Sequence, residues 1–305
     1  MRAERSSVRF SSGRTECAAW HYPGANGACL IMAGGFAVPK EPGTDRFARR
    51  FQEAGYSVLA FDYRGLGASG GTPRQVLPVR RQLADWHAAV GFAAGLPEVD
   101  PDRIALWGFS ASAGFLLPVA ARDRRVAAVV AQSPAVGGLA ASRLPSGHQS
   151  PSATLRLTAR GIADAVGGLL GRPPLMVPLA GPRGTLAMLA TPDAQQGDAV
   201  LNAGGRYPEW RQEVAARSAL GVALFNAGRY APRVRCPVLM VVCEGDRTAD
   251  PRAARRAAAR IPDVRVVTVP GGHYAPFQDA HEQTVKAELA FLRQHVADTT
   301  AAALG

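Results

Sequence analysis

The chain has 305 residues, 47% of them hydrophobic, so it can bury a large core as one domain with an insertion or as two small domains. Its formal net charge is +11, but the positive residues are almost all arginine and are spread along the sequence without interleaved aromatic platforms. We therefore expect a solvated basic surface and no nucleic-acid partner. The same charge would attract an acidic substrate or carrier over long range.

Four cysteines, Cys17, Cys29, Cys236 and Cys243, form no Cys-x-x-Cys pair, and no histidine lies at metal-ligand spacing from them. This pattern indicates unpaired thiols in a cytoplasmic protein, with no metal and no other cofactor. Residues 1–7 carry charge but no apolar segment, so we expect no signal peptide. No run of about 18 apolar residues occurs, which argues against a transmembrane helix and a membrane partner.

Over the first 132 residues, continuous apolar runs alternate with segments whose apolar residues recur at helical spacing. The predicted elements are a hairpin over 8–22, a strand over 29–32, a helix over 45–54 that Gly55 ends, a strand over 56–63, a helix over 78–96, a strand over 104–107 that Gly108 ends, a helix from Ala111, and a strand over 125–132. This alternation is typical of a parallel sheet covered on both faces.

The rhythm changes between residues 134 and 232, a stretch rich in Gly and Pro with helix-like segments at 152–170 and 208–225. The sheet pattern then resumes with a strand over 236–243, a helix over 251–261, a strand over 264–269 and a closing helix over 278–296. We predict an α/β fold with a mostly parallel, doubly wound sheet and an antiparallel N-terminal hairpin. Residues 1–133 and 233–305 would form the core, and residues 134–232 a mostly helical lid insertion.

Ser110 lies between the predicted strand at 104–107 and the helix that follows it. A sharp strand-turn-helix needs small neighbours around its apex, and Gly108 and Ser112 provide them. Ser69 matches the Gly-x-Ser-x-Gly pattern better, yet it lies in a turn-rich loop that no helix follows. We interpret Ser110 as a nucleophile at such an elbow and Ser69 as a loop residue.

A serine nucleophile needs a base, and histidine titrates near neutral pH. His273 directly follows the last predicted strand, where open α/β sheets place their sites, and two preceding glycines let its loop reach across. The loop after the strand at 236–243 offers Glu244, Asp246 and Asp250 as the orienting carboxylate. We choose Asp246, because the alternative, Asp250, precedes a proline and is explained as a helix N-cap.

Acyl transfer also needs two backbone donors for the developing oxyanion. Ala111, the residue after the nucleophile, should give one N–H group. Phe36, which follows two glycines after the strand at 29–32, should give the other. The alternative for residues 33–36 is an ordinary Gly-Gly turn.

These residues together resemble the α/β-hydrolase superfamily along nearly the whole chain. More narrowly, segments 60–69, 100–108 and 130–134 are similar to a branch called dienelactone-hydrolase-like or X-prolyl-peptidase-like, which includes fungal polyketide transferases. The resemblance implies the α/β-hydrolase fold. It also implies Ser110, Asp246 and His273 as a triad, with Phe36 and Ala111 as oxyanion donors.

We expect a serine hydrolase that cleaves an ester, thioester or lactone, with acyl transfer to an alcohol or amine as the alternative. The substrate would be a small acyl compound, free or carrier-bound. A peptidase role is disfavoured because the chain has no room for further domains, and a non-catalytic binding role is disfavoured by the intact triad. The apolar residues of the insertion would exclude water from a site or form a small core of their own: Leu169, Leu170, Leu175, Met176, Leu179, Leu186, Met188 and Leu189.

Overall fold

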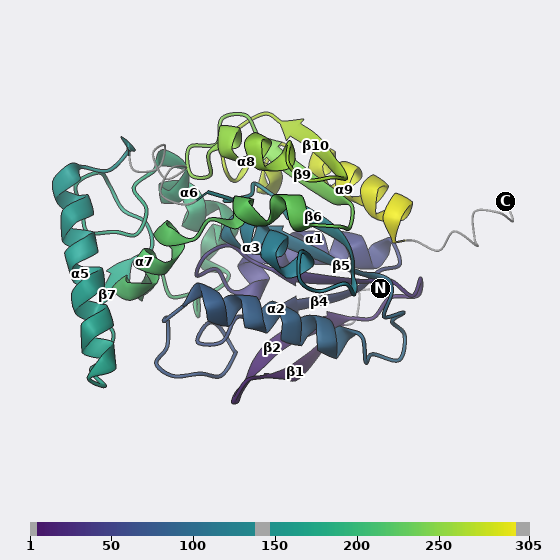
Figure 1. Ribbon diagram of the computed structural model, residues 1–305, viewed down its shortest axis with the longest axis horizontal. Helices are drawn as coiled ribbons and strands as arrows, with labels where there is room; N and C mark the ends of the chain where they lie inside the picture. Colours follow the sequence, from purple (N-terminus) through teal and green to yellow (C-terminus); the bar gives the residue numbers. More distant parts are fainter. Residues whose placement is uncertain (1–4, 138–146, 297–305) are drawn as a thin grey trace, which may run out of the picture.

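The computed structural model describes residues 5–137 and 147–296 (Figure 1). Three ranges lie outside the described residues: 1–4, 138–146 and 297–305. They include part of the segment in which no signal peptide is expected, part of the predicted insertion and the end of the predicted core. Within the described ranges, no helix combines the length and the apolar character that crossing a bilayer requires.

An eight-stranded sheet organises the chain, in the order β1-β2-β4-β3-β5-β6-β9-β10. The strands are β1 (Ser6–Ser12), β2 (Thr15–Tyr22), β3 (Cys29–Ala33), β4 (Ser57–Phe61), β5 (Ile104–Phe109), β6 (Val126–Gln132), β9 (Val238–Cys243) and β10 (Val264–Val269). Strand β2 pairs antiparallel with β1 and β4, and the remaining pairs are parallel. The predicted fold class is therefore confirmed.

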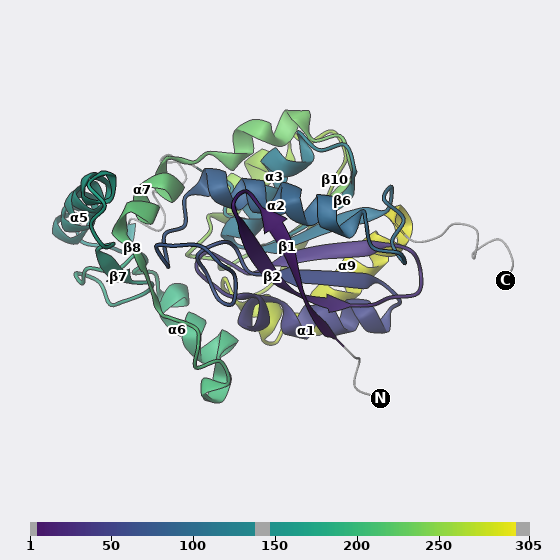
Figure 2. The same ribbon diagram turned by 90° about the horizontal axis from the view of Figure 1, so that it is seen from below.

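Helices cover both faces of this sheet, as Figure 2 shows. Helices α1 (Lys40–Glu53) and α9 (His281–His295) contact each other on one face, and α2 (Val79–Ala93) and α3 (Ala111–Ala120) contact each other on the other face. Helix α8 (Pro251–Ala258) packs on β9 and β10. Strands β3, β4, β5 and β9 are buried along their whole length, which explains their continuous apolar sequences.

Several boundaries in the core differ from the sequence prediction by a few residues, and two of the differences have a clear local cause. Helix α1 begins at Lys40, not at Asp45, because Pro42 lies in its first turn, where no intrahelical N–H bond is needed. Gly43 in this turn lies against Gly34, where a Cβ atom would come within 2.6 Å of the Gly34 Cα atom. Strand β5 continues through Gly108 to Phe109, because both residues pair with β6.

The segment between β6 and β9 lies at one end of the sheet (Figure 1). It contains α5 (Pro151–Leu169), β7 (Met176–Pro178), α6 (Pro192–Leu201), β8 (Glu213–Ala215) and α7 (Ala216–Leu224), with short 3-10 helices at Ala203–Gly205 and Ala227–Arg233. The helix predicted over 152–170 is confirmed as α5. The helix predicted over 208–225 is wrong in its first half, because Glu213–Ala215 pairs with the distant strand β7.

Candidate active site

Ser110 is the one residue between the end of β5 at Phe109 and the start of α3 at Ala111. Its backbone has φ 57° and ψ −117°, a conformation that is rare and strained for a residue with a Cβ atom. Gly108 relieves crowding in this turn, because a Cβ atom there would lie 2.8 Å from the Ala113 amide nitrogen. Gly114 does the same one helical turn later, where a Cβ atom would lie 2.1 Å from the Ala135 carbonyl oxygen.

Backbone hydrogen bonds hold this turn in place. The Ser110 amide donates to the Gln132 carbonyl at 2.9 Å, and the Ser110 carbonyl accepts from Gly114 at 3.2 Å and from Ala135 at 3.0 Å. The strained conformation is therefore fixed by the strand on one side and the helix on the other. The hydroxyl group of Ser110 is presented at the carboxyl end of β5.

The structure brings His273 to this hydroxyl group. His273 follows β10, its side chain is buried, and its Nε2 atom lies 2.9 Å from Ser110 Oγ. Ser133, which follows β6, donates from its hydroxyl group to the His273 carbonyl at 3.1 Å. The imidazole also packs on the Phe109 ring, with 4.9 Å between the ring centroids.

Of the candidate carboxylates, the structure places Asp246 on the histidine. Its Oδ2 atom lies 2.7 Å from His273 Nδ1, and its Oδ1 atom accepts the amides of Thr248 and Ala249 at 2.8 and 2.7 Å. Asp250 instead caps α8 by accepting the Arg252 amide at 2.9 Å. The N-cap interpretation of Asp250 is thereby confirmed.

Phe36 and Ala111 lie beside the nucleophile. Both line the same cavity as Ser110, and neither amide donates a backbone hydrogen bond to any residue of the described ranges. The loop of Phe36 is close to the elbow, because a Cβ atom on Gly35 would lie 3.5 Å from Ser110 Cβ. Ser112 joins the two segments, since its hydroxyl group donates to the Gly34 carbonyl.

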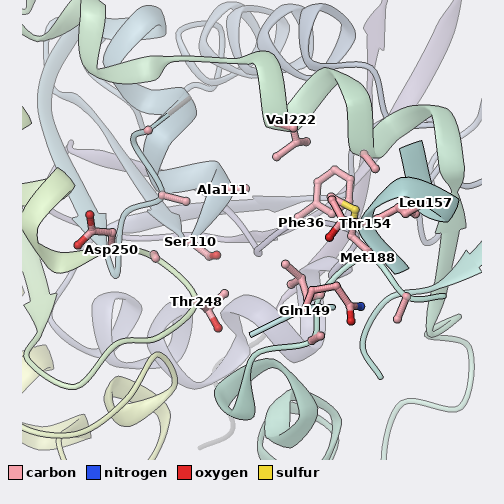
Figure 3. A pocket seen from close by; sticks show the side chains of 18 of the residues that line it. Phe36, Ser110, Ala111, Gln149, Thr154, Leu157, Met188, Val222, Thr248 and Asp250 are labelled. Carbon is pink, nitrogen blue, oxygen red and sulfur yellow. The ribbon is translucent and has the colours of Figure 1, made fainter. Parts of the chain in front are cut away.

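The larger cavity at Ser110 has a volume of about 280 Å³ and a mostly apolar lining (Figure 3). The core contributes Phe36, Ala111 and Thr248 to it. The segment between β6 and β9 contributes residues from α5, from the loop before α6 and from α7: Thr154, Leu157, Thr158, Ala187, Met188, Leu189, Ala190, Ala219, Leu220, Val222 and Ala223. The apolar residues proposed for the lid thus divide, because Met188 and Leu189 line this cavity while Leu169 and Leu170 are exposed.

A smaller cavity of about 40 Å³ lies on the other side of Ser110. Unlike the larger one, it is lined by His273 and Tyr274. Both cavities share Ser110, Phe36, Leu189 and Thr248, so Ser110 lies where the two compartments meet.

Sequence analysis missed Asp193, near the N-terminus of α6. One of its carboxylate oxygens, Oδ2, accepts the His273 amide at 3.1 Å and the Arg247 amide at 2.8 Å. It therefore connects the loop of the histidine to the loop of the acid. The available signal was Thr191 before Pro192, an N-cap and first-turn pair that marks the start of a helix.

Ser69, the competing serine, uses its hydroxyl group to hold the backbone of neighbouring segments. Its buried hydroxyl group accepts the Ala18 amide at 2.8 Å and donates to the Asp62 carbonyl at 2.6 Å.

The cysteines are free, and burial raises the pKa of the Cys243 thiol to about 12. Across the part of the chain that the structure describes, no group of three or more Cys, His, Asp or Glu side chains is arranged to hold a metal ion.

Comparison with known proteins places this geometry in context. The sequence pattern of the "Alpha/beta hydrolase family" matches residues 26–287. A quorum-quenching protein, AidA, of Acinetobacter baumannii (strain MDR-ZJ06) is 36% identical over 294 residues, which is 95% of this chain and 94% of that protein. A thiohydrolase of Eupenicillium brefeldianum is 29% identical over 253 residues, covering 80% of this chain and 78% of that protein.

The polyketide transferase grgF of Penicillium sp. is 39% identical over 135 residues, but this match covers only 43% of this chain and 46% of that protein. The crystal structure of alpha/beta hydrolase GrgF from Penicillium sp. sh18 superimposes with a TM-score of 0.80 at 25% identity. That superposition covers 96% of this chain and 99% of the other. The shared architecture thus extends through the segment between β6 and β9.

Proposed function

The chain belongs to the alpha/beta hydrolase family, an enzyme family, and from that premise we propose that it is a serine hydrolase that cleaves a carboxylic ester, thioester or lactone. The observation that carries this proposal is the continuous series of contacts from Ser110 Oγ to His273 Nε2 (2.9 Å) and from His273 Nδ1 to Asp246 Oδ2 (2.7 Å). This is the arrangement in which a histidine removes a serine proton and a carboxylate orients the histidine.

The reaction would proceed in two halves. Ser110 Oγ attacks the acyl carbonyl carbon while His273 Nε2 takes the hydroxyl proton, and the amides of Phe36 and Ala111 stabilise the oxyanion. The bond to the leaving oxygen or sulfur then breaks, and His273 returns the proton to that atom. In the second half, water gives a proton to His273 and attacks the acyl-serine, and His273 returns that proton to Ser110 Oγ as the carboxylic acid leaves.

The larger cavity would hold the acyl chain. Its volume of about 280 Å³ and its apolar lining favour an apolar chain of medium length, because each buried methylene contributes about 0.8 kcal/mol to the free energy of binding. The smaller cavity would take the leaving group, since His273 must reach the leaving atom and lines only this compartment of the two. The name of one relative, a thiohydrolase, favours an acyl compound with a thioester bond.

Acyl transfer is the second candidate, and the relative named a polyketide transferase favours it. The same groups serve both reactions, with an alcohol or amine replacing water in the second half. A carrier-bound acyl group would deliver the substrate in either case. The choice depends on whether water or an acceptor reaches the acyl-serine.

We further propose that residues 134–232 form a lid over a hydrolase core of residues 1–133 and 233–305. The cavity lining supports this division, because α5 and α7 cover Ser110 from outside the sheet. The free cysteines support a reducing, cytoplasmic compartment.

Mass spectrometry of the intact protein tests these proposals. We expect octanoyl esters and thioesters to leave an acyl group on Ser110, and a chase with water or with candidate alcohols and amines to distinguish hydrolysis from transfer. We also expect kcat/KM for p-nitrophenyl octanoate to exceed that for the acetate by about tenfold or more. A preference for acetate would contradict an acyl chain in the larger cavity, and no acyl-serine with any ester, thioester or lactone would contradict the proposed function.

A further inference from the structure

Helix α5 carries an apolar stripe on its outer face. In both views of the molecule α5 forms the outer edge at the end farthest from the strands of the main sheet (Figures 1 and 2). Leu155, Ile162 and Leu169 on this helix are 70%, 54% and 88% exposed, and Val166 is 52% exposed. Large aliphatic side chains with this exposure on one helix indicate a surface that binds a partner.

The spacing of the stripe identifies the kind of partner. Leu155, Ala159, Ile162, Val166 and Leu169 follow one another at intervals of four, three, four and three residues. At about 100° per residue, the five positions fall within an arc of about 80°, which is the narrow seam of a helix that packs on one other helix. A helix that lies in a bilayer surface has a broader apolar face and exposes its polar face to water.

The opposite face of α5 is already occupied. Gly161 packs against α7, where a Cβ atom would lie 3.0 Å from the Leu220 side chain and 3.1 Å from the Ala216 carbonyl oxygen. Asp164, buried on this side, forms an ion pair with Arg217 at 2.9 Å. The seam is therefore the face that is left for a partner.

From this seam we infer that two copies of the chain associate through antiparallel α5 helices, with Ile162 on the twofold axis. A twofold interface must present the same surface from both sides, and the seam does so, because Leu155 and Leu169 are each seven residues from Ile162. Leu155 then faces the partner's Leu169. The small Ala159 lies near the partner's Val166, so that side-chain sizes alternate across the interface.

The charges of α5 favour the antiparallel direction. Arg156, which borders the seam, would lie at the level of the partner's Gly168 in this direction, whereas a parallel pair would place two Arg156 side chains at one level. Thr158, Ala163 and Ala165, which also border the seam, are small and permit close approach, and the exposed Leu170 borders it at the end of the helix. No carboxylate on α5 borders the seam to attract a basic partner, since Asp164 faces α7.

The length of the seam sets the strength of association. From Leu155 to Leu169 it measures about 21 Å, and one helix pair of this length buries less than the roughly 800 Å² per partner of a standard interface. The dimer therefore forms in a concentration-dependent manner, in the micromolar range. The inference does not depend on the proposed reaction.

Sedimentation velocity of the full chain between about 1 and 200 µM tests the inference. We expect the weight-average mass to rise toward that of a dimer with concentration, and Ile162→Asp to keep the chain monomeric, because two carboxylates would meet on the axis. Val266→Asp on β10, which replaces another partly exposed aliphatic residue, serves as the matched control and should dimerise like the parent chain. A parent chain that stays monomeric throughout this range would overturn the inference.

Cysteine cross-linking tests the direction of the helices. Oxidation of Ile162→Cys should give a disulfide-linked dimer, whereas Leu169→Cys should not, because its two copies lie about 21 Å apart. Ile162 and Leu169 are both exposed, so neither substitution removes a core contact. Cross-linking of Leu169→Cys but not Ile162→Cys would overturn the antiparallel pair. If the monomer binds anionic vesicles and Ile162→Asp abolishes this binding, the stripe is a membrane-binding surface. That result would also overturn the antiparallel dimer.

Discussion

Ser110 is a residue whose backbone shows its special role more clearly than its sequence motif does. A φ of 57° on a serine persists only where the surroundings fix it, and Gln132 of β6, Gly114 of α3 and Ala135 all hydrogen-bond to its peptide groups. Ser69 has the better motif and neither the strain nor a histidine. The two serines therefore make a direct comparison possible.

We expect Ser110→Ala to abolish labelling by a serine-directed fluorophosphonate while the protein keeps its stability. Ser69→Ala should remain labelled but should lose about 1–3 kcal/mol of stability, because it leaves the Ala18 amide and the Asp62 carbonyl without a partner. Gel labelling and denaturant unfolding measure the two effects. Labelling that follows Ser69 would refute the assignment of the elbow.

The two candidate acids can be separated in the same way. Asp246→Asn should lower kcat by up to about 10⁴, because an amide stabilises the wrong tautomer of His273. Asp250→Asn should change kcat by only a few-fold, because asparagine caps α8 as well as aspartate does. Steady-state kinetics with one ester measures both. Comparable losses in the two variants would leave Asp246 without its proposed role.

At the scale of elements, α6 contacts the two loops that carry Asp246 and His273. Thr191, its N-cap, contacts Thr248 through the two hydroxyl groups at 2.6 Å, and Asp193 accepts amides from both loops. Gly197 lies under Tyr274, where a Cβ atom would come within 2.6 Å of the phenol oxygen. The segment between β6 and β9 therefore supports the geometry of the site in addition to covering it.

Asp193 is expected to act as a positioning residue. Asp193→Ala removes the acceptor for both loops and should lower kcat by about 10- to 100-fold with little change in KM, because misplacement by about 1 Å is that costly. Asp193→Asn keeps a carbonyl acceptor and should restore most of kcat, a rescue that general destabilisation would not produce. Glu209→Ala, at an exposed carboxylate of the same segment, is the control. Equal kcat in all four proteins would exclude the positioning role.

At the scale of the whole molecule, α9 packs on the sheet and places the carboxyl group of Glu288 in the core. Glu288 is fully buried, and its Oε1 atom accepts the Trp107 indole N–H at 3.2 Å. Its Oε2 atom has no partner among the described residues. Burial raises the pKa of Glu288 well above its usual value of 4.5.

This carboxyl group makes stability depend on pH. Above pH 4.5 the unfolded chain loses the Glu288 proton while the folded chain keeps it, so the free energy of unfolding falls as pH rises toward the folded-state pKa. We expect Glu288→Gln to become more stable than the parent chain as pH rises from 5 to 8, by up to about 1.4 kcal/mol per pH unit. Denaturant unfolding at each pH measures the difference. The exposed Glu282→Gln on α9 should show no such trend, and parallel curves for Glu288→Gln and the parent would contradict a protonated Glu288.

The sequence predicted most of the core, because the conformation of a strand or helix is encoded in its own residues. Buried strands appear as unbroken apolar runs, and alternation with helices predicts a parallel sheet. The carboxyl ends of parallel strands share one edge, so chain order alone brought Ser110, Asp246 and His273 into one group of candidates. The insertion was predicted less well, since β8 exists only through its pairing with β7 and α6 was missed despite its capping residues.

The remaining features depend on contacts between residues that are far apart in the sequence. The sequence favoured Asp246 over Asp250, because Asp250 precedes a proline, and the folded chain adds the distances that place Asp246 on His273 and Asp250 on its own helix. Asp193 meets a histidine loop 80 residues away, and the two compartments at Ser110 are formed by segments spread from Gly35 to Tyr274. Local pattern thus determined most elements of the core and the choice of Ser110 as the candidate nucleophile. The tertiary structure decided which cavities and which supporting residue surround Ser110, because those are set by distances that sequence spacing does not fix.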